Sequence, residues 1–376
     1  MKRTPLYEAH ESAGAKLVDF AGWDMPIQYS GVVDEYRTVR TKAGLFDVSH
    51  MGRIEITGPG SSSFLQRVAT NDLATLPAGQ SHYSMICNER GGIKDDIFIY
   101  AVASEEFLVC VNASNREKIL TWMRGQLASD DACRVIDRSE ELAQLALQGP
   151  DSKELLSMLK IDGLAALKPR HLLRSKIFDE SVLIARTGYT GELGYELYLP
   201  ARSVRRLWNH LMEIGQPKGL KPAGLGSRDL LRLEMGYLLY GNDIDEDTTP
   251  LEAGAGWLVH LNKGGFIGRD ALLRQQAAGL RRRLVSFELL EKAVPRHGCS
   301  ILGPDTKANP VGLVTSGNFS PLLQKGIGLG YVTLALAEPG TRLHIDIRGK
   351  HCVAVVVKAP FYKRPKGSHI AYGTNK

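Results

Sequence analysis

The sequence predicts an α+β protein in which two mixed αβ regions precede a C-terminal antiparallel β-barrel or sandwich. At 376 residues the chain is too long for one ordinary hydrophobic core. Strand-like and helix-like runs alternate until about residue 280, and short β runs punctuated by Gly and Pro then fill residues 283–360. We therefore expect the αβ regions at residues 1–280, the antiparallel domain at 281–366 and a tail at 367–376.

The first αβ region is expected to begin with an amphipathic helix. Leu6, Ala9, Ala13 and Leu17 recur near helical spacing. The aromatic stretch after them contains Gly and Pro, which favours an irregular loop. The predicted elements of this region are a helix over residues 5–20, the loop over 20–26, a helix over 32–43, a strand over 54–58, and helices over 61–68 and 114–127.

The most informative stretch is residues 88–100. Two glycines mark a turn, and an apolar run rich in β-branched and aromatic residues then predicts a strand that begins with Asp95 and Asp96. Side chains alternate along a strand, so these carboxylates point to opposite faces. A second strand-like run ends at Asn112, and a hairpin centred near Ser104 places Asn112 opposite Asp96. The pair is either a turn-capping Asp with an Asn at a strand end, or a functional pair on an apolar sheet.

The second αβ region, from residue 142 onward, has a similar pattern of strand-like runs with a carboxylate on one of them. A glycine-rich turn at residues 187–194 joins two strand-like runs, and the second of them contains Glu196. A charged residue inside a strand either sits at a solvated edge or binds a donor-rich heterocycle. Further helices are expected at residues 151–160, from an N-cap at Ser227 towards Gly236, and at 270–278.

Composition and motifs disfavour several classes of function. The net charge of +6 is mild and the basic clusters are short, so we expect no nucleic-acid partner. No apolar run approaches the roughly 20 residues of a membrane span and no signal-peptide core begins the chain, which favours a cytoplasmic protein. Five scattered cysteines and the absence of zincin or EF-hand spacing predict no disulfide framework and no metal site. Asp47, Ser49 and His50 are close in sequence, but without a nucleophile elbow they do not indicate a hydrolase.

Eight short motifs are spread over nearly the whole chain. They are Thr-Pro-Leu at residues 4–6, Asp-Phe-Ala-Gly-Trp-Asp-Met-Pro at 19–26, Gly-Leu-Phe-Asp-Val-Ser-His-Met-Gly at 44–52, the stretch at 88–97, Gly-Tyr-Thr-Gly-Glu at 188–192, Ala-Gly-Leu-Gly-Ser-Arg-Asp at 223–229, Tyr-Gly-Asn-Asp-Ile-Asp at 240–245, and Thr-Ser-Gly-Asn-Phe-Ser-Pro at 315–321. In this order they resemble the aminomethyltransferase (T-protein) family of the glycine cleavage system. One departure is Leu193, which stands where the family often has Asp.

The resemblance implies a three-lobed ring around a tetrahydrofolate channel, with two αβ lobes and a third lobe formed by the C-terminal barrel. It implies an enzyme of one-carbon metabolism that uses tetrahydrofolate as acceptor substrate and a lipoylated carrier (H) protein as partner. The carbon of the aminomethyl group on the dihydrolipoyl arm passes to tetrahydrofolate as 5,10-methylenetetrahydrofolate, and ammonia is released.

The resemblance also assigns roles to individual residues. It implies that Asp96 is the catalytic carboxylate beside the folate N5 and N10, where it stabilises positive charge and orients the attacking amine. Asp95 is expected to be structural. Glu196 and Arg228 are implied to hold the pterin, because a carboxylate accepts its adjacent N–H groups and a guanidinium donates to its carbonyl. The remaining residues expected at the folate are Tyr83, Asn112, Met51, Tyr189 and Tyr237, with Arg364 at the glutamate tail.

Two alternatives share the predicted fold. One is a folate-dependent demethylase, whose relatives usually accompany a flavin domain; no Gly-x-Gly-x-x-Gly motif after a strand is present here. The other is a non-enzymatic folate-binding protein of tRNA modification or iron–sulfur assembly. That family carries a signature cysteine in a turn that corresponds to residues 186–191, and this turn has no cysteine.

Overall fold

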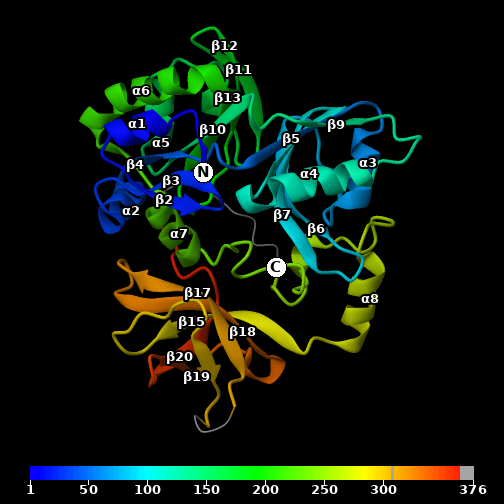
Figure 1. Cartoon of the computed structure of the whole chain (residues 1–376), viewed down its shortest axis with the longest axis vertical. Helices are drawn as coiled ribbons and strands as arrows, with labels where there is room; N and C mark the ends of the chain where they lie inside the picture. Colours follow the sequence, from blue (N-terminus) through cyan, green and yellow to red (C-terminus); the bar gives the residue numbers. More distant parts are fainter. Residues whose placement is uncertain (306–308, 365–376) are drawn as a thin grey trace.

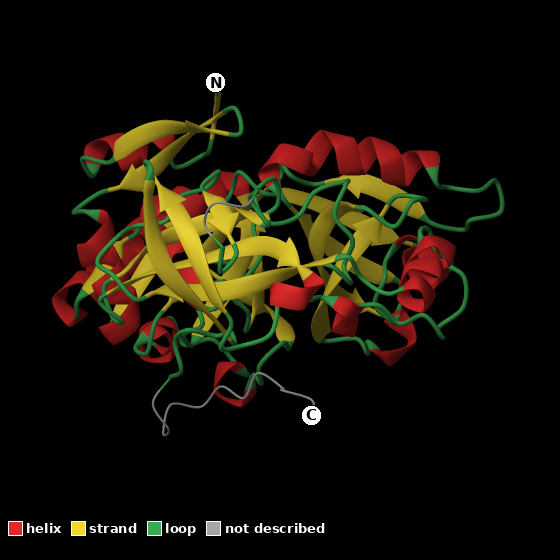
Figure 2. Cartoon of the chain, turned by 90° about the horizontal axis from the view of Figure 1, so that it is seen from below, coloured by secondary structure: helices red, strands yellow, loops and turns green. Residues whose placement is uncertain are grey.

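The chain folds into three lobes (Figure 1). Side chains from all three lobes line a central cavity. The computed structural model describes residues 1–305 and 309–364, so the predicted tail at 367–376 lies outside the described residues. In Figure 1 the first lobe is at the upper left, the second at the upper right and the C-terminal barrel at the bottom. Helices lie mainly at the periphery and strands towards the centre (Figure 2). No helix of the described residues is long and apolar enough to span a membrane.

The first lobe is built on a six-stranded sheet with helices on both faces. Its strand order is β11-β12-β13-β10-β4-β14. Helix α6 (Val204–Gly215) buries Val204, Leu207, Trp208 and Leu211 against one face, the spacing expected of an amphipathic helix. The other elements are β4 (Ala43–Asp47), β10 (Leu142–Gln148), α5 (Ser152–Ser157), β11 (Leu172–Ile177), β12 (Glu180–Ala185), β13 (Gly194–Pro200) and β14 (Leu220–Pro222), with α2 (Val32–Thr41) and α7 (Leu225–Glu234) on the opposite face.

The N-terminal segment differs from the prediction. The helix expected over residues 5–20 is wrong beyond Ser12, where α1 (Tyr7–Ser12) ends before Gly14 at a φ of 72°. The rest of that stretch is β2 (Lys16–Phe20), which pairs with β3 (Trp23–Gln28) where a loop was predicted. Pairing between strands outweighs the short apolar spacing that suggested a helix. The turn consists of Ala21 and Gly22, both with positive φ, as the tightest hairpins require. Strand β1 (Lys2–Arg3) completes this small sheet.

The second lobe is a five-stranded sheet of order β6-β7-β8-β5-β9. Its outer face is apolar and packs against helices. Ile97 and Ile99, two residues apart on β7, both point to this face and are buried in the same hydrophobic cluster as residues of α3 and α4. Its inner face carries Tyr100, which packs against Tyr198 of the first lobe. The elements are β5 (Gly52–Thr57), α3 (Ser61–Val68), β6 (Gln80–Cys87), β7 (Ile93–Ala103), β8 (Glu106–Val111), α4 (Arg116–Gly125) and β9 (Arg134–Asp137), with α8 (Arg269–Ala278) beside them.

The third lobe is a closed antiparallel barrel, which is one of the two architectures that the C-terminal β runs predicted. Its six strands follow the order β15-β18-β17-β16-β19-β20 around the barrel. Closure removes the exposed strand edges that an open sheet would present. The strands are β15 (Arg282–Leu289), β16 (Ser300–Leu302), β17 (Gly312–Ser320), β18 (Lys325–Thr333), β19 (Arg342–Ile347) and β20 (Lys350–Val357).

Helix α7 begins earlier than predicted. Its N-cap is Gly224 and not Ser227, whose hydroxyl lies inside the first turn and donates to the Gly224 carbonyl at 2.9 Å. The Gly224 N–H donates to the buried Glu35 carboxylate at 2.8 Å. A Cβ at Gly224 would lie 2.5 Å from the backbone of Ile27, so only glycine fits where β3 crosses this helix end.

Candidate active site

The central cavity has a volume of about 1420 Å³ and takes side chains from all three lobes. This volume exceeds the ~300–1,000 Å³ of most small-molecule sites. The cavity therefore has room for a large ligand, or for two ligands that meet inside it. All nine residues predicted for the site line it: Asp96, Glu196, Arg228, Tyr83, Asn112, Met51, Tyr189, Tyr237 and Arg364.

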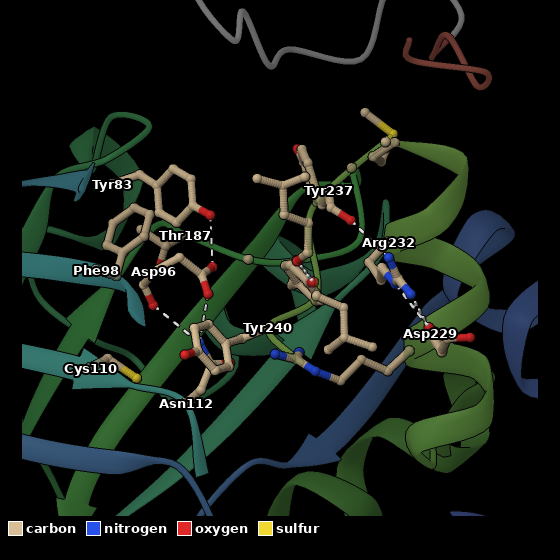
Figure 3. Close-up of a pocket in the computed structure, with 18 of the residues that line it drawn as sticks. Tyr83, Asp96, Phe98, Cys110, Asn112, Thr187, Asp229, Arg232, Tyr237 and Tyr240 are labelled. Atoms are coloured by element: carbon tan, nitrogen blue, oxygen red, sulfur yellow. Dashed lines mark hydrogen bonds and ion pairs between the residues drawn. The ribbon is translucent and has the colours of Figure 1, made fainter. Parts of the chain in front are cut away.

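Asp96 lies on β7 and faces the cavity. One carboxylate oxygen accepts a hydrogen bond from the Tyr83 hydroxyl at 2.7 Å, and the other accepts one from Asn112 Nδ2 at 2.7 Å (Figure 3). The hairpin register pairs Phe98 with Cys110, which confirms that Asp96 lies opposite Asn112. Burial is the main reason that the pKa of Asp96 is raised. The Asp–Asn pair therefore belongs to a cavity wall and not merely to a turn cap.

Asp95 points to the opposite face of the same strand and is fully buried. Its carboxylate accepts from the Asn112 backbone N–H at 3.0 Å, from Asn112 Nδ2 at 2.9 Å and from Asn115 Nδ2 at 2.6 Å. Burial and the neighbouring Asp96 raise the pKa of Asp95 to about 7. The alternation of faces predicted from the sequence is confirmed, but Asn112 joins the two carboxylates.

Glu196 lies on β13, which is an interior strand of the first lobe's sheet. It is 9% exposed, so the solvated-edge interpretation is wrong. Its carboxylate accepts hydrogen bonds from Gln144 Nε2 at 3.1 Å and from the Tyr100 hydroxyl at 3.0 Å. The Thr187 hydroxyl donates to it as well. Three neutral donors thus stabilise a buried carboxylate that lines the cavity.

Arg228 and two tyrosines form a third part of the cavity wall. The Arg228 guanidinium lies 4.7 Å from the centre of the Tyr189 ring, within range of a cation–π interaction. Tyr189 in turn stacks on Tyr237, with ring centres 5.6 Å apart and planes inclined by 26°. These flat surfaces are suited to an aromatic or heterocyclic ligand.

Two family models match consecutive parts of the chain. The GCVT N-terminal domain matches residues 6–263, and the glycine cleavage T-protein C-terminal barrel domain matches residues 282–363. The chain belongs to the glycine cleavage T-protein family. The family predicted from the sequence motifs is thereby confirmed, and so is the fold of two αβ lobes with a barrel.

Individual members of this T-protein family resemble the chain over nearly its full length. The aminomethyltransferase of Halothermothrix orenii is 48% identical over 361 residues, which cover 96% of this chain and 100% of the relative. The aminomethyltransferase of Desulforamulus reducens is 44% identical over 97% of this chain and 99% of its own. A crystal structure of the glycine cleavage system aminomethyltransferase T from Bartonella henselae superposes with a TM-score of 0.90 at 37% identity and covers 96% of this chain and 98% of that one.

Arg364 lines the cavity of this T-protein family member but already has a protein partner. Its Nε lies 3.4 Å from an oxygen of the buried Glu192 carboxylate. Arg40 contacts the same carboxylate at 3.0 Å and also pairs with buried Glu234 at 2.7 Å. A ligand carboxylate at Arg364 would therefore compete with Glu192 or share the arginine with it.

Sequence reasoning did not identify the residues that hold the predicted site in place. Gln144, Tyr100 and Thr187 support Glu196, and Asn115 supports Asp95. Thr187 alone had a local signal, because it opens the glycine-rich turn. Gln144 and Tyr100 became neighbours of Glu196 only through the packing of distant strands, whereas Asn115 lies just after the hairpin of β7 and β8.

The structure contains no alternative catalytic constellation at the motif of residues 44–52. Asp47 accepts from His10 Nε2 at 2.9 Å and from the Thr4 hydroxyl at 2.6 Å, so its histidine partner is not the nearby His50. Burial lowers the pKa of His50 to about 3. Among residues 1–305 and 309–364, no group of His, Cys, Asp and Glu could hold a metal ion.

Proposed function

We propose that this chain is an aminomethyltransferase that transfers the methylene carbon of an S-aminomethyldihydrolipoyl carrier protein to tetrahydrofolate. The observation that carries the proposal is Asp96, fixed by Tyr83 and Asn112 on the wall of a cavity that also contains Glu196. The aminomethyltransferases at 44–48% identity favour this activity over a demethylase or a binding protein without activity.

The reaction requires groups that stabilise positive charge and move protons. The C–S and C–N bonds of the aminomethyl carbon break, and new C–N bonds form to N5 and N10 of tetrahydrofolate. The two N–H protons of the folate end on the lipoyl sulfur and on the departing ammonia. An ionised Asp96 stabilises the iminium-like carbon and accepts protons from the folate nitrogens, because its raised pKa makes it a stronger base than an ordinary carboxylate.

The pterin would occupy the wall that contains Glu196 and Arg228. A carboxylate offers roughly four acceptor sites, of which three protein donors occupy three at Glu196. We therefore assign one direct pterin N–H bond to Glu196 in place of the two that the resemblance suggested. Arg228 would donate to the ring carbonyl, and the Tyr189–Tyr237 stack would contact the ring face.

The carrier arm and the folate would meet inside one cavity. Its volume of about 1420 Å³ supports the presence of both substrates near Asp96. We propose that the carrier is the lipoylated H protein and that the reaction takes place in the cytoplasm. The five cysteines are all free thiols, as expected in a reducing compartment.

Reconstitution tests this function directly. Purified protein is mixed with aminomethylated carrier and tetrahydrofolate, and methylenetetrahydrofolate and ammonia are measured together. We expect the two products in equal amounts, with neither formed when folate is omitted at the same enzyme concentration. Folate binding without either product would instead support the non-enzymatic alternative, and methylenetetrahydrofolate formed from an N-methyl donor would support the demethylase.

A further inference from the structure

The Asn112 carboxamide connects two carboxylates that point to opposite faces of β7. Its Nδ2 atom lies 2.9 Å from Asp95 Oδ1 and 2.7 Å from Asp96 Oδ1, with the Asp96 backbone oxygen at 3.2 Å. An amide nitrogen carries only two hydrogens, and each carboxylate accepts one of them in this arrangement. Any rotation of Asn112 therefore affects both carboxylates at once.

Asp95 is surrounded by donors that stabilise its charged form and partly offset burial and the neighbouring Asp96, which raise its pKa to about 7. The Asn112 backbone N–H, Asn112 Nδ2 and Asn115 Nδ2 all donate to it, and the side chain is fully buried. Three N–H donors stabilise a carboxylate and offer no acceptor for a carboxyl proton. Within the described residues neither Asp95 nor Asp96 forms an ion pair with Lys, Arg or His. The charge of Asp95 is thus not neutralised by a local cation.

In the described part of the chain, the other ionisable groups that face this pair include Tyr83, Tyr189, Tyr240 and Asp243. Tyr83 donates to Asp96 from β6, and Tyr189 and Tyr240 approach from the loops across the cavity. Asp243 is compensated, because Arg232 Nη1 lies 2.8 Å from its carboxylate. The hydroxyl of Tyr240 accepts a bond from Lys118 at 2.9 Å, and this lysine pairs with Glu246. Asp95 therefore shares the Asn112 donor with Asp96 and has no cationic partner among the described residues.

We propose that Asp95 is a positioning residue for Asp96: through the Asn112 amide that the two carboxylates share, it fixes the orientation of the catalytic carboxylate and places a second carboxylate charge beside it. This inference rests on the proposed function, because it assumes that Asp96 accepts protons during the transfer. It assigns Asp95 more than the structural role expected from the sequence. Two carboxyls this close titrate as a pair and not as independent groups.

The test is the pH profile of kcat for the intact protein with aminomethylated carrier and tetrahydrofolate, compared between wild type and Asp95→Asn. Removal of the neighbouring charge lowers the pKa of Asp96, so the acid limb of the profile should move down by about one pH unit. A weaker base also transfers protons less well, so plateau kcat should fall about tenfold. The KM for tetrahydrofolate should change less than about twofold, because Asp95 does not reach the cavity.

A second variant keeps the test decisive if Asp95→Asn does not fold. Asn115→Ala removes one donor from Asp95 and none from Asp96. Neutral Asp95 is then favoured, and the acid limb should move down by a smaller amount. The exposed Asp130→Asn removes one charge from the same lobe and should leave the profile unchanged.

The possible outcomes separate the two proposals. An acid limb that stays at its wild-type position in Asp95→Asn and in Asn115→Ala, whatever the loss of kcat, would give Asp95 a purely structural role and overturn the inference. A wild-type protein that forms no methylenetetrahydrofolate would instead overturn the proposed function. Circular dichroism and thermal unfolding of each variant establish that folded protein is being compared.

Discussion

The two αβ lobes each place one strand-borne carboxylate on the cavity wall, and the surroundings of the two carboxylates differ. Asp96 of the second lobe accepts from Tyr83 and Asn112 and lies beside another carboxylate, Asp95. Glu196 of the first lobe accepts from three neutral donors and, among the residues that the structure describes, shares none of them with another acid. The same chemical group thus lies beside a second carboxylate in one lobe and among neutral donors in the other.

Contact between the lobes couples these two arrangements. Tyr100 belongs to the sheet that carries Asp96, yet its hydroxyl donates to Glu196 across the lobe boundary. Its ring lies 5.2 Å from that of Phe98 and 5.3 Å from that of Tyr198, so it is packed on both sides. The relative position of the two lobes therefore determines how far the proposed folate-binding wall lies from the proposed catalytic carboxylate.

The largest effect is expected at Asp96. Asp96→Asn removes the charge with little change in volume, so the transfer rate should fall about 100-fold or more, as for a positioned acid–base group. Steady-state kinetics with aminomethylated carrier measures this loss, and thermal unfolding shows whether the fold is retained. Activity within a few-fold of wild type would remove Asp96 from the chemistry.

A smaller effect of a different kind is expected on the opposite wall. Glu196→Gln and Arg228→Ala each disrupt charge-assisted hydrogen bonds worth about 1.5–3 kcal/mol, so the Kd for tetrahydrofolate should rise about ten- to a hundredfold. Calorimetric titration of folate separates this effect from a loss of kcat. If both variants kept the wild-type Kd, the pterin would have to lie elsewhere in the cavity.

The sequence was sufficient for the parts of this comparison that depend on local patterns. Alternation along β7 placed Asp95 and Asp96 on opposite faces, and the hairpin register placed Asn112 opposite Asp96. The helices predicted at residues 61–68 and 270–278 also agree closely with α3 and α8. The resemblance to the family predicted that Glu196 and Arg228 share a site with Asp96, and all three residues line the same cavity.

What could not be predicted depends on contacts between distant segments. Gln144 reaches Glu196 because β10 pairs with β13, and no spacing along the chain encodes that pairing. The strands β2 and β3 replaced an expected helix and loop because each supplies the other's hydrogen bonds. The partner of Arg364 was also missed, since Glu192 is buried beside it only in the assembled three-lobed structure.

Two matched tyrosine variants test the difference between Asp96 and Glu196, because each variant removes one hydroxyl donor from one of the two carboxylates. Tyr83→Phe removes a hydrogen-bond donor to Asp96, so the pKa of Asp96 should rise. The acid limb of the pH profile of kcat should therefore move to higher pH, and kcat near neutrality should fall about three- to tenfold. Tyr100→Phe removes a donor to Glu196 and should weaken folate binding by a similar factor while the acid limb stays in place. Parallel pH profiles and folate titrations measure both, and identical behaviour of the two variants would contradict the division of roles.

The smallest predicted effect concerns the cavity mouth and the carrier protein. Among residues 1–305 and 309–364, the exposed cations that line the cavity are Arg170 of the first lobe, Arg296 of the barrel and Lys363 of the segment after it. The acidic side chains of these residues that line the cavity are buried or half-buried. This arrangement and the net charge of +6 favour electrostatic attraction of an acidic carrier. Salt shortens the Debye length to about 8 Å at physiological ionic strength and weakens such steering.

The apparent KM for the carrier should therefore rise about two- to fivefold between low and physiological salt, while that for tetrahydrofolate changes much less. Steady-state kinetics across a salt series measures both constants, and Arg296→Ala provides a matched comparison because its partner Asn318 is uncharged. This variant should reduce the salt dependence for the carrier without changing the response to folate. A carrier KM that is flat with salt in the wild type would show that the cations at the mouth do not guide the carrier, and that contacts insensitive to salt dominate its binding.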